Sequence, residues 1–396
     1  MIVRAGFDVP LVKNIHTEEL EVADDTRIRD VLPTLKYLIE QKAKIIIISH
    51  LDRPQGRQEN KSLWPVAVKL SELINYKVVK VHDKLPDYQV PHINFLASDI
   101  TKRDYSKLSR EVPSGNILFL ENLRFYKQEE ANDEEFVKNL ADFGDVYVNE
   151  AFSVAHRKAA STVGLAKKLP AYGGISFIKE IHALQKITKN PALPMVVLLG
   201  GIKIADKVET IHNLAKHASK IIVGGGMGST FLKAREYEVG ESKISEVSMA
   251  KQLLRQYKDK LVLPVDVVVA AGLKSRPRVS AVEKVLPNEA IFDIGPETIR
   301  NFATVIKTAK TLAWNGPFGM FEDPRYGHGS RAIAQVFAAQ SKGRAYGLVG
   351  GGETVEVIDQ AKVTEFIDHI STGGGAMLEF LSGKQLPAIK ALEANG

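Results

Sequence analysis

The first half of the chain repeatedly places basic side chains beside apolar, strand-like segments. These residues are Arg4, Arg27, His50, Arg53, Arg124, His156 and Arg157. The planar guanidinium fork of arginine binds carboxylate and phosphate groups bidentately, so several arginines at one edge of a sheet would hold a small polyanion. Any one of them alone fits a surface salt bridge better, and either histidine could be structural, since no Ser or Cys nucleophile pattern joins them. The repetition favours an anion-binding pocket.

Three glycine triplets mark the second half, at residues 224–226, 350–352 and 373–375. The first two follow strand-like segments and precede helical patterns. Glycines at such turns let backbone N–H groups approach a phosphate, whose charge the start of a helix also favours. An empty tight turn would explain one triplet, but two at the carboxyl ends of parallel strands favour a nucleotide. A Walker A loop and an opening G-x-G-x-x-G fingerprint are both absent from the sequence.

Two lysines stand four residues apart in the glycine-containing segment 200–207. Lys203 falls in the expected loop, and Lys207 falls in the first turn of the following helix, with Asp206 as its expected N-cap. A lysine at a helix N-terminus is electrostatically unfavourable unless an anion binds there. Solvated surface lysines are the simple alternative, but the adjoining glycines favour phosphate contacts.

Two carboxylates accompany these segments. Glu322 follows the apolar segment 311–314 and could bind a ribose hydroxyl. Glu353 directly follows a glycine triplet and could reach a Mg²⁺ ion carried by a nucleotide, because Mg²⁺ typically keeps few protein ligands. Helix capping is an equally good explanation for both carboxylates.

Length and composition bound the class of protein. The chain has 396 residues, enough for roughly two or three domains, with 44% hydrophobic and 25% charged residues. It lacks cysteine, which excludes disulfides and thiolate metal sites. The net charge of +6 suits an anionic small substrate as well as nucleic acid and does not decide between them, but no Lys/Arg-rich block favours nucleic acid. No apolar run is long enough to span a membrane, so we expect a cytoplasmic protein.

Eight short, apolar segments predict strands, at 44–49, 116–120, 145–149, 195–199, 220–224, 261–265, 311–314 and 345–350. Helical patterns between them predict parallel sheets covered by helices. One helix should begin after Thr26 and bend or break at Pro33, and another should begin near Pro296. The segment 169–194 predicts a helical connector between two domains.

With these residues considered, the sequence resembles phosphoglycerate kinase over nearly its whole length. The motifs that carry the resemblance lie at 4–10, 24–29, 50–54, 120–125, 147–162, 199–207, 224–232, 263–269, 293–296, 314–322, 349–354 and 369–380. The resemblance implies an α/β fold of two Rossmann-like, three-layer domains with parallel sheets, joined by an interdomain helix. It places an acid-substrate domain at 1–170, the connecting helix at 171–190 and a nucleotide-binding domain at 191–377, with the tail 378–396 packed on the first domain.

The resemblance also implies an activity. It is reversible phosphoryl transfer in glycolysis from 1,3-bisphosphoglycerate to MgADP, which gives 3-phosphoglycerate and ATP. The family suggests a monomer that closes by hinge bending, with no nucleic-acid or membrane partner. Direct transfer needs positioning and charge neutralisation rather than an enzyme nucleophile.

The family's functional residues carry over position by position. The acid pocket would comprise Gly6, Phe7, Asp8, Arg27, His50, Leu51, Asp52, Arg53, Arg124 and Arg157. The nucleotide site would comprise Lys203, Lys207, Gly224, Gly225, Asn315, Glu322, Gly351, Gly352, Glu353 and Thr354. Arg27, Lys203, Gly351 and Gly374 are the expected catalytic residues, and Glu353 is expected to hold Mg²⁺ through the nucleotide.

The chain departs from the family's usual pattern at several of these positions. Gly6 and Asp8 flank Phe7 where Asp-Phe-Asn is usual, Asp52 replaces a Gly, and Glu353 replaces an Asp. Asp8 and Asp52 each place a carboxylate near the acid. An alternative is therefore a catalytically weakened homologue that binds nucleotide but not the acid. A different α/β enzyme, such as a dehydrogenase, is disfavoured by the missing dinucleotide fingerprint.

Overall fold

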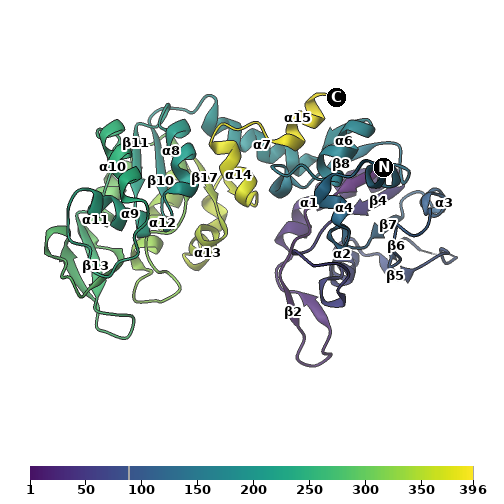
Figure 1. The fold of residues 1–396 in the computed structure, drawn as a ribbon, viewed down its shortest axis with the longest axis horizontal. Coiled ribbons are helices and arrows are strands. Elements are labelled where there is room, and N and C mark those ends of the chain that lie inside the picture. The colour runs from purple at the N-terminus through teal and green to yellow at the C-terminus, as the bar shows by residue number, and fades with distance from the viewer. Residues whose placement is uncertain (88–89, 396) are drawn as a thin grey trace. The chain divides into compact units, whose positions relative to one another are not determined.

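Two units, each built around its own parallel sheet, make up the chain (Figure 1). The computed structural model describes residues 1–87 and 90–395. The first unit contains residues 1–181 and 385–395, and the second contains 182–384, so the division falls inside helix α7 (Ile175–Thr188). The domain boundaries expected from the resemblance, at 170, 190 and 377, remain a prediction.

The sheet of the first unit has seven parallel strands in the order β5-β6-β7-β4-β1-β8-β9. Its strands are β1 (Ile2–Arg4), β4 (Ile45–Ile48), β5 (Lys77–Val81), β6 (His92–Leu96), β7 (Ile117–Leu120), β8 (Tyr147–Asn149) and β9 (Ala171–Gly173). All four isoleucines of β4 are buried, as expected for a central parallel strand covered on both faces. A separate antiparallel hairpin joins β2 (Leu11–Lys13) to β3 (Leu20–Val22).

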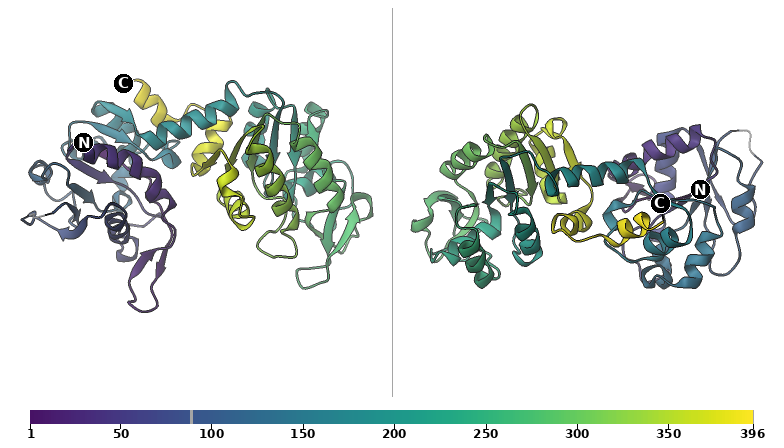
Figure 2. Two further views of the ribbon diagram at one scale, coloured as in Figure 1. Left: turned by 180° about the vertical axis from the view of Figure 1, so that it is seen from behind. Right: turned by 90° about the horizontal axis from the view of Figure 1, so that it is seen from above.

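The first unit also contains helices. They are α1 (Thr26–Glu40), α2 (Trp64–Ile74), α3 (Ser106–Glu111), α4 (Lys127–Ala131), α5 (Glu134–Ala141), α6 (Leu165–Lys168) and α15 (Pro387–Glu393), with short helical turns at Glu59–Lys61, Leu123–Phe125, Phe152–Val154 and Ala160–Gly164. The last helix, α15, belongs to the first unit although the whole second unit precedes it in the sequence (Figure 2). Its Ala388 N–H donates to the Ala155 carbonyl at 3.0 Å, and the Asn395 amide donates to the Ala166 carbonyl at 2.6 Å.

Helix α1 contains Pro33, at which the sequence predicts a bend or a break. The break does not occur, because the helix continues from Thr26 to Glu40, whereas the bend stays a prediction. Proline removes one backbone hydrogen bond from a helix interior. Here the buried apolar face, which includes Ile28, Val31 and Leu35, holds the helix together because helical stability comes largely from tertiary packing.

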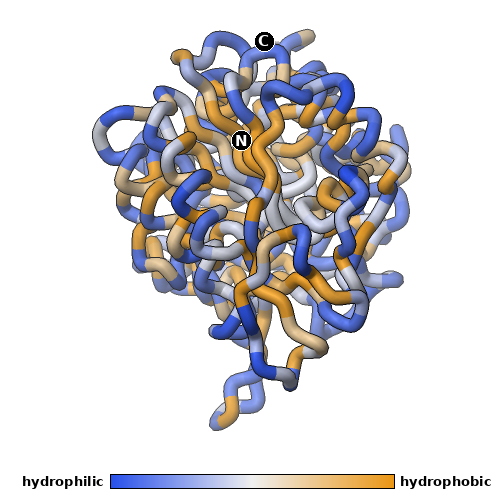
Figure 3. The backbone as a smooth tube through the Cα atoms, turned by 90° about the vertical axis from the view of Figure 1, so that its left-hand side faces the viewer, coloured by the Kyte–Doolittle hydropathy of each residue, from blue (hydrophilic) through white to orange (hydrophobic). Residues whose placement is uncertain are grey.

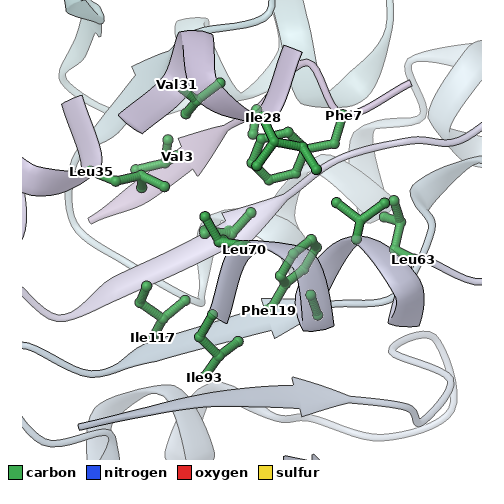
Figure 4. Close-up of a cluster of buried hydrophobic side chains, with 14 of the residues drawn as sticks. Val3, Phe7, Ile28, Val31, Leu35, Leu63, Leu70, Ile93, Ile117 and Phe119 are labelled. Atoms are coloured by element: carbon green, nitrogen blue, oxygen red, sulfur yellow. The ribbon is translucent and has the colours of Figure 1, made fainter. Parts of the chain in front are cut away.

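The core of the first unit lies between the sheet and α1 and α2. In the backbone tube of Figure 3, hydrophobic segments gather toward the interior and hydrophilic segments lie mostly at the periphery. Figure 4 shows side chains from α1, α2 and the central strands meeting in one cluster. Phe119 lies at its centre, with ring centroids 5.9 Å from Phe7 and 5.8 Å from Phe95. This packing fixes the sheet edge from which the loops of the first unit project.

The second unit has a six-stranded parallel sheet in the order β12-β11-β10-β16-β17-β18. Its strands are β10 (Met195–Leu199), β11 (Lys220–Val223), β12 (Leu261–Val262), β16 (Thr311–Asn315), β17 (Tyr346–Gly350) and β18 (His369–Ser371). Its helices are α8 (Val208–Leu214), α9 (Gly225–Ala234), α10 (Val247–Gln256), α11 (Pro296–Ile306), α12 (His328–Ser341), α13 (Gly352–Gln360) and α14 (Gly374–Leu381), with short turns at Ala205–Lys207, Val282–Lys284 and Thr364–Phe366.

A small antiparallel sheet in the second unit was not expected from the sequence. It pairs β13 (Asp266–Ala270) with β14 (Arg278–Ala281) and β15 (Ala290–Ile294). The expected strand at 261–265 is correspondingly short, ending at Val262. The large parallel sheets nevertheless confirm the predicted α/β class.

The start of helix α8 corrects another expectation. Asp206 was expected to cap this helix, but it lies within the preceding turn Ala205–Lys207, and Lys207 occupies the N-cap position. Because the chain forms a separate turn at Ala205–Lys207 before α8 begins, Asp206 lies one residue before the N-cap position. In contrast, Pro296 begins α11 as predicted.

Candidate functional site

Loops after four neighbouring strands carry charged residues of the first unit, basic after β7, β4 and β8 and acidic after β1. The strands lie in the order β7-β4-β1-β8, and the segments that follow them contain Arg124, His50 with Arg53, Asp8, and Arg157, respectively. Because the strands are parallel, all four loops leave the same edge of the sheet, where open α/β sheets bind ligands. Arg27 joins them from the first turn of α1.

Asp8 connects several of these loops. Its Oδ1 accepts the Asp52 N–H at 2.7 Å, while its Oδ2 lies 3.7 Å from His50 Nε2 and 4.0 Å from Arg27 Nη1. Arg27 also donates a hydrogen bond to the Asp8 carbonyl. The carboxylate therefore lies among the donors that were expected to bind the acid.

The His50 ring is buried and held from its other side by Arg4, whose Nη2 lies 2.8 Å from Nδ1. Burial lowers the pKa of His50 to about 3, and the positive charges of Arg4 and Arg124 act in the same direction. The ring is therefore neutral at neutral pH. Because a guanidinium can only donate, Nδ1 must accept, which leaves the ring proton on Nε2.

Arg4 belongs to a buried polar network that sequence reasoning did not find. Its Nε donates to Ser161 Oγ at 2.7 Å, and Ser161 in turn donates to Glu129 Oε1 at 2.6 Å. Glu129 is buried, and burial raises the pKa of its carboxyl although the charge of Arg4 opposes this. The sequence signal for this network is Arg4 itself, a charged residue at the end of an apolar strand.

Asp52, one of the departures from the family pattern, has a local partner. Its carboxylate forms an ion pair with Lys61, and its carbonyl accepts a hydrogen bond from Arg124 Nη1 at 2.6 Å. The residue has φ +57°, a left-handed conformation that glycine adopts readily and that aspartate tolerates. Lys61 thus offsets the extra charge at this position.

The remaining acid-site candidates contribute in different ways. Arg157 lines a cavity of about 400 Å³ together with Arg4 and Arg124, and its charge helps to lower the pKa of Arg124 after the larger effect of burial. The Arg53 side chain is exposed. Phe7 and Leu51 have buried side chains.

Backbone groups of the same segments are mostly engaged. The Phe7 N–H donates to Ser49 Oγ at 3.1 Å, and the Leu51 N–H donates to Asn122 Oδ1 at 3.2 Å. At Gly6, a Cβ would approach Ala151 no closer than 3.6 Å, so the space does not demand glycine there. These contacts fix the loops rather than leave groups open for a ligand.

The second unit repeats the arrangement with glycine-rich loops. Its strands β11, β10, β16 and β17 are neighbours, and the loops after them contain Gly224, Lys203, Glu322 and Gly351, respectively. Two expected strand–glycine–helix turns are present, leading into α9 and α13. The third triplet also follows a strand, β18, and Gly374 begins α14.

The two lysines of the first such loop lie in different surroundings. Lys203 is exposed. Lys207 is buried, and its Nζ donates to the carbonyls of Gly200 at 2.6 Å and Asn315 at 3.0 Å. Burial lowers the pKa of Lys207 to about 8, against the opposing negative charges of Glu353 and Asp206.

Asn315 and Thr354 hold neighbouring loops together. The Asn315 side chain donates to the Gly350 carbonyl at 2.8 Å, and Thr354 Oγ1 accepts the Gly316 N–H at 2.7 Å. Gly351 has φ +93°, and a Cβ there would lie 2.7 Å from Asn315 Nδ2. Only glycine fits this close approach between the two loops.

A cavity of about 330 Å³ opens beside these loops. Its walls include Gly225, Pro317, Glu322 and Glu353, together with apolar side chains such as Leu232. Gly225 has φ +62°, and a Cβ there would lie 2.8 Å from the Pro317 carbonyl oxygen. An apolar cavity with a few polar groups at its rim is typical of a small-molecule site.

Not every nucleotide-site candidate lines this cavity. The nucleotide-site candidates that do not line it are Lys203, Lys207, Gly224, Asn315, Gly351, Gly352 and Thr354. The catalytic candidate Gly374 does not line it either, although Gly352 is the first residue of α13 and Gly374 is the first residue of α14. The first-turn amides of these helices lack intrahelical partners, which makes both positions compatible with phosphate contacts. Of the nucleotide-site candidates, Gly225, Glu322 and Glu353 thus line one cavity.

The donor set bears on metal binding. Among residues 1–87 and 90–395, no three His, Cys, Asp or Glu side chains are grouped to hold a metal ion. A Mg²⁺ ion that arrives with nucleotide phosphates needs few protein ligands. Glu353, one of the carboxylates on the cavity wall, fits that chemistry.

Within the described part of the chain, the helices are too short or too polar to span a bilayer.

Comparisons with known proteins agree on one family. The family model for phosphoglycerate kinase matches residues 1–384. Curated relatives named phosphoglycerate kinase include those of Dictyoglomus turgidum, 40% identical, and Moorella thermoacetica, 42% identical; each alignment covers 99% of this chain and 95% of the relative.

Solved structures give the same result. The phosphoglycerate kinase of Coxiella burnetii matches with a TM-score of 0.84 and 37% identity, covering 99% of this chain and 95% of that chain. That of Pyrococcus horikoshii matches with a TM-score of 0.81 and 29% identity, covering 100% and 96%, respectively. The strand-end loops described above thus lie on a shared fold, and the chain belongs to the phosphoglycerate kinase family.

Proposed function

We propose that this glycolytic kinase transfers a phosphoryl group reversibly from 1,3-bisphosphoglycerate to MgADP, giving 3-phosphoglycerate and ATP. The observation that carries the proposal is the set of basic residues in the loops after β7, β4 and β8, together with Arg27 in the first turn of α1. Such a set suits a small acid that carries phosphate and carboxylate groups. The comparisons give no support to the alternative of a weakened homologue.

We assign the acid to the first unit and the nucleotide to the second, with domain boundaries near 170, 190 and 377 as expected from the sequence. Arg27, Arg124 and Arg157 would hold the acid's anionic groups. The cavity beside Gly225 and Glu322 would hold the nucleoside. We also propose that the protein acts in the cytoplasm as a monomer, as the family resemblance implies.

The chemistry requires positioning and charge stabilisation. Arg27 and Lys203 would stabilise the charge on the transferring phosphoryl group, and the backbone amides at Gly351 and Gly374 would orient it. Glu353 would hold Mg²⁺, which neutralises phosphate charge when it is bound with the nucleotide.

A coupled assay tests this proposal. MgATP and 3-phosphoglycerate are supplied, and product removal is followed by an NADH-linked dehydrogenase. We expect turnover that requires both substrates. If turnover is absent and calorimetry still detects ATP binding but no 3-phosphoglycerate binding, the weakened-homologue alternative replaces the kinase.

The buried lysine predicts a pH dependence of nucleotide binding. Lys207 is charged below its pKa of about 8 and neutral above it, so its attraction for phosphate is lost as pH rises. We expect the Kd for ADP to rise about tenfold between pH 7.5 and 9, measured by calorimetry. The variant Lys207→Arg should flatten this rise because arginine stays charged, and an equal rise in both proteins would contradict the assignment.

A further inference from the structure

The Asp8 carboxylate occupies an unusual place in the first unit. One oxygen is anchored, because Oδ1 accepts the Asp52 N–H at 2.7 Å. The other oxygen, Oδ2, lies between two groups of the acid pocket, 3.7 Å from His50 Nε2 and 4.0 Å from Arg27 Nη1. A carboxylate of the chain itself therefore stands where an anionic ligand would meet these donors.

The donor on the histidine side is fixed. Arg4 donates to His50 Nδ1, so the proton of the neutral ring is on Nε2 and faces Asp8. The His50 side chain is 1% exposed, whereas that of Asp8 is 36% exposed. A ligand that approaches the Nε2 proton from solvent therefore meets the Asp8 carboxylate first.

The neighbouring carboxylate does not share this role. Asp52 forms its ion pair with Lys61, whose charge offsets it locally. The Asp8 carboxylate instead contacts Arg27 and His50. Burial opposes ionisation of Asp8, but the contacts from His50, the Asp52 N–H and Arg27 outweigh it and hold the pKa of Asp8 below its usual range.

We propose that Asp8 is an internal anion that holds Arg27 and His50 in place when no acid is bound, and that a phosphate or carboxylate ligand must compete with it. Asp8 thereby sets the affinity of the pocket for small acids. This inference rests on the proposed role of the first unit in binding the acid. Two anions so close repel each other, so the carboxylate weakens binding of the ligand.

The variant Asp8→Asn tests the proposal. Its amide oxygen can still accept the Asp52 N–H, while the negative charge is removed. We expect the Kd values for 3-phosphoglycerate and for inorganic phosphate, measured by calorimetry, to fall at least tenfold. The KM for 3-phosphoglycerate should fall in parallel, and the KM for ATP should stay within twofold of the original value.

Two further variants serve as controls. Glu135→Gln removes one negative charge from an exposed position on α5 and should leave both Kd values unchanged. Asp8→Ser removes the same charge as Asp8→Asn with a smaller side chain, and it should also tighten binding. Agreement between the two Asp8 variants separates the effect of charge from that of side-chain shape.

The outcomes distinguish this inference from the proposed function. Unchanged or weaker phosphate binding in both Asp8 variants would overturn the inference, even if the original protein turns over. Tighter phosphate binding in both variants would support it, even if the original protein showed no turnover with 3-phosphoglycerate. In that second case only the proposed reaction would fail.

Discussion

Replacing Arg27 by alanine should lower kcat about a thousandfold, because an arginine that neutralises the transferring phosphoryl group contributes on the order of 10³-fold or more to such reactions. The side chain is 35% exposed and contacts Asp8, so its removal leaves the core intact. The Kd for ADP should remain within twofold because the nucleotide candidates lie in the second unit. Steady-state kinetics in the coupled assay, with calorimetry for ADP, measure both quantities.

Arg29 on the same helix provides a matched control. It is exposed and pairs with Asp25 through Nε at 2.7 Å, away from the Asp8 contacts. The variant Arg29→Ala should change kcat less than twofold, since an exposed ion pair contributes little. A similar loss of kcat in both variants would mean that general charge or helix stability, rather than Arg27 itself, is responsible.

Replacing Arg4 by methionine should destabilise the first unit by about 3–5 kcal/mol, the usual cost of leaving one member of a buried charged pair uncompensated. The variant removes the guanidinium that donates to His50 and Ser161 and that lies near the buried Glu129. The double variant Arg4→Met with Glu129→Gln should recover part of the loss, because it removes the uncompensated carboxylate.

Urea unfolding followed by tryptophan fluorescence measures this effect in the unit concerned. The chain has two tryptophans, Trp64 in the first unit and Trp314 in the second. A Trp314→Phe background leaves Trp64 as the reporter. A loss below about 1 kcal/mol for Arg4→Met, or no recovery in the double variant, would show that Arg4 and Glu129 are not energetically coupled.

The fold was predictable where strands are long and apolar throughout. The strands Met195–Leu199 and Tyr346–Gly350 are buried on both faces and stand out as continuous apolar runs. The three-residue strand β1 is too short for such a signal, and β5, at the sheet edge, is interrupted by two lysines in the sequence Lys-Val-Val-Lys-Val. The unbroken course of α1 past Pro33 depends on tertiary packing, which local preferences do not contain.

The candidate site was predictable in position but not in its internal connections. Basic residues after strand ends indicated which edge of the sheet to examine, because parallel strands align their carboxyl ends. The burial of Lys207 depends on carbonyls from residues as distant as Asn315, 108 positions along the chain. Likewise, the link from Arg4 through Ser161 to Glu129 joins three separate segments, so no local pattern reveals it.

The placement of α15 in the first unit has a consequence for synthesis on the ribosome. Domains generally fold from the N-terminus as the chain emerges. Ala388 and Asn395 donate hydrogen bonds to the carbonyls of Ala155 and Ala166. The ribosome synthesises these two acceptors long before it synthesises the two donors. The surface of the first unit that α15 covers therefore stays exposed during synthesis until the ribosome has translated the entire second unit.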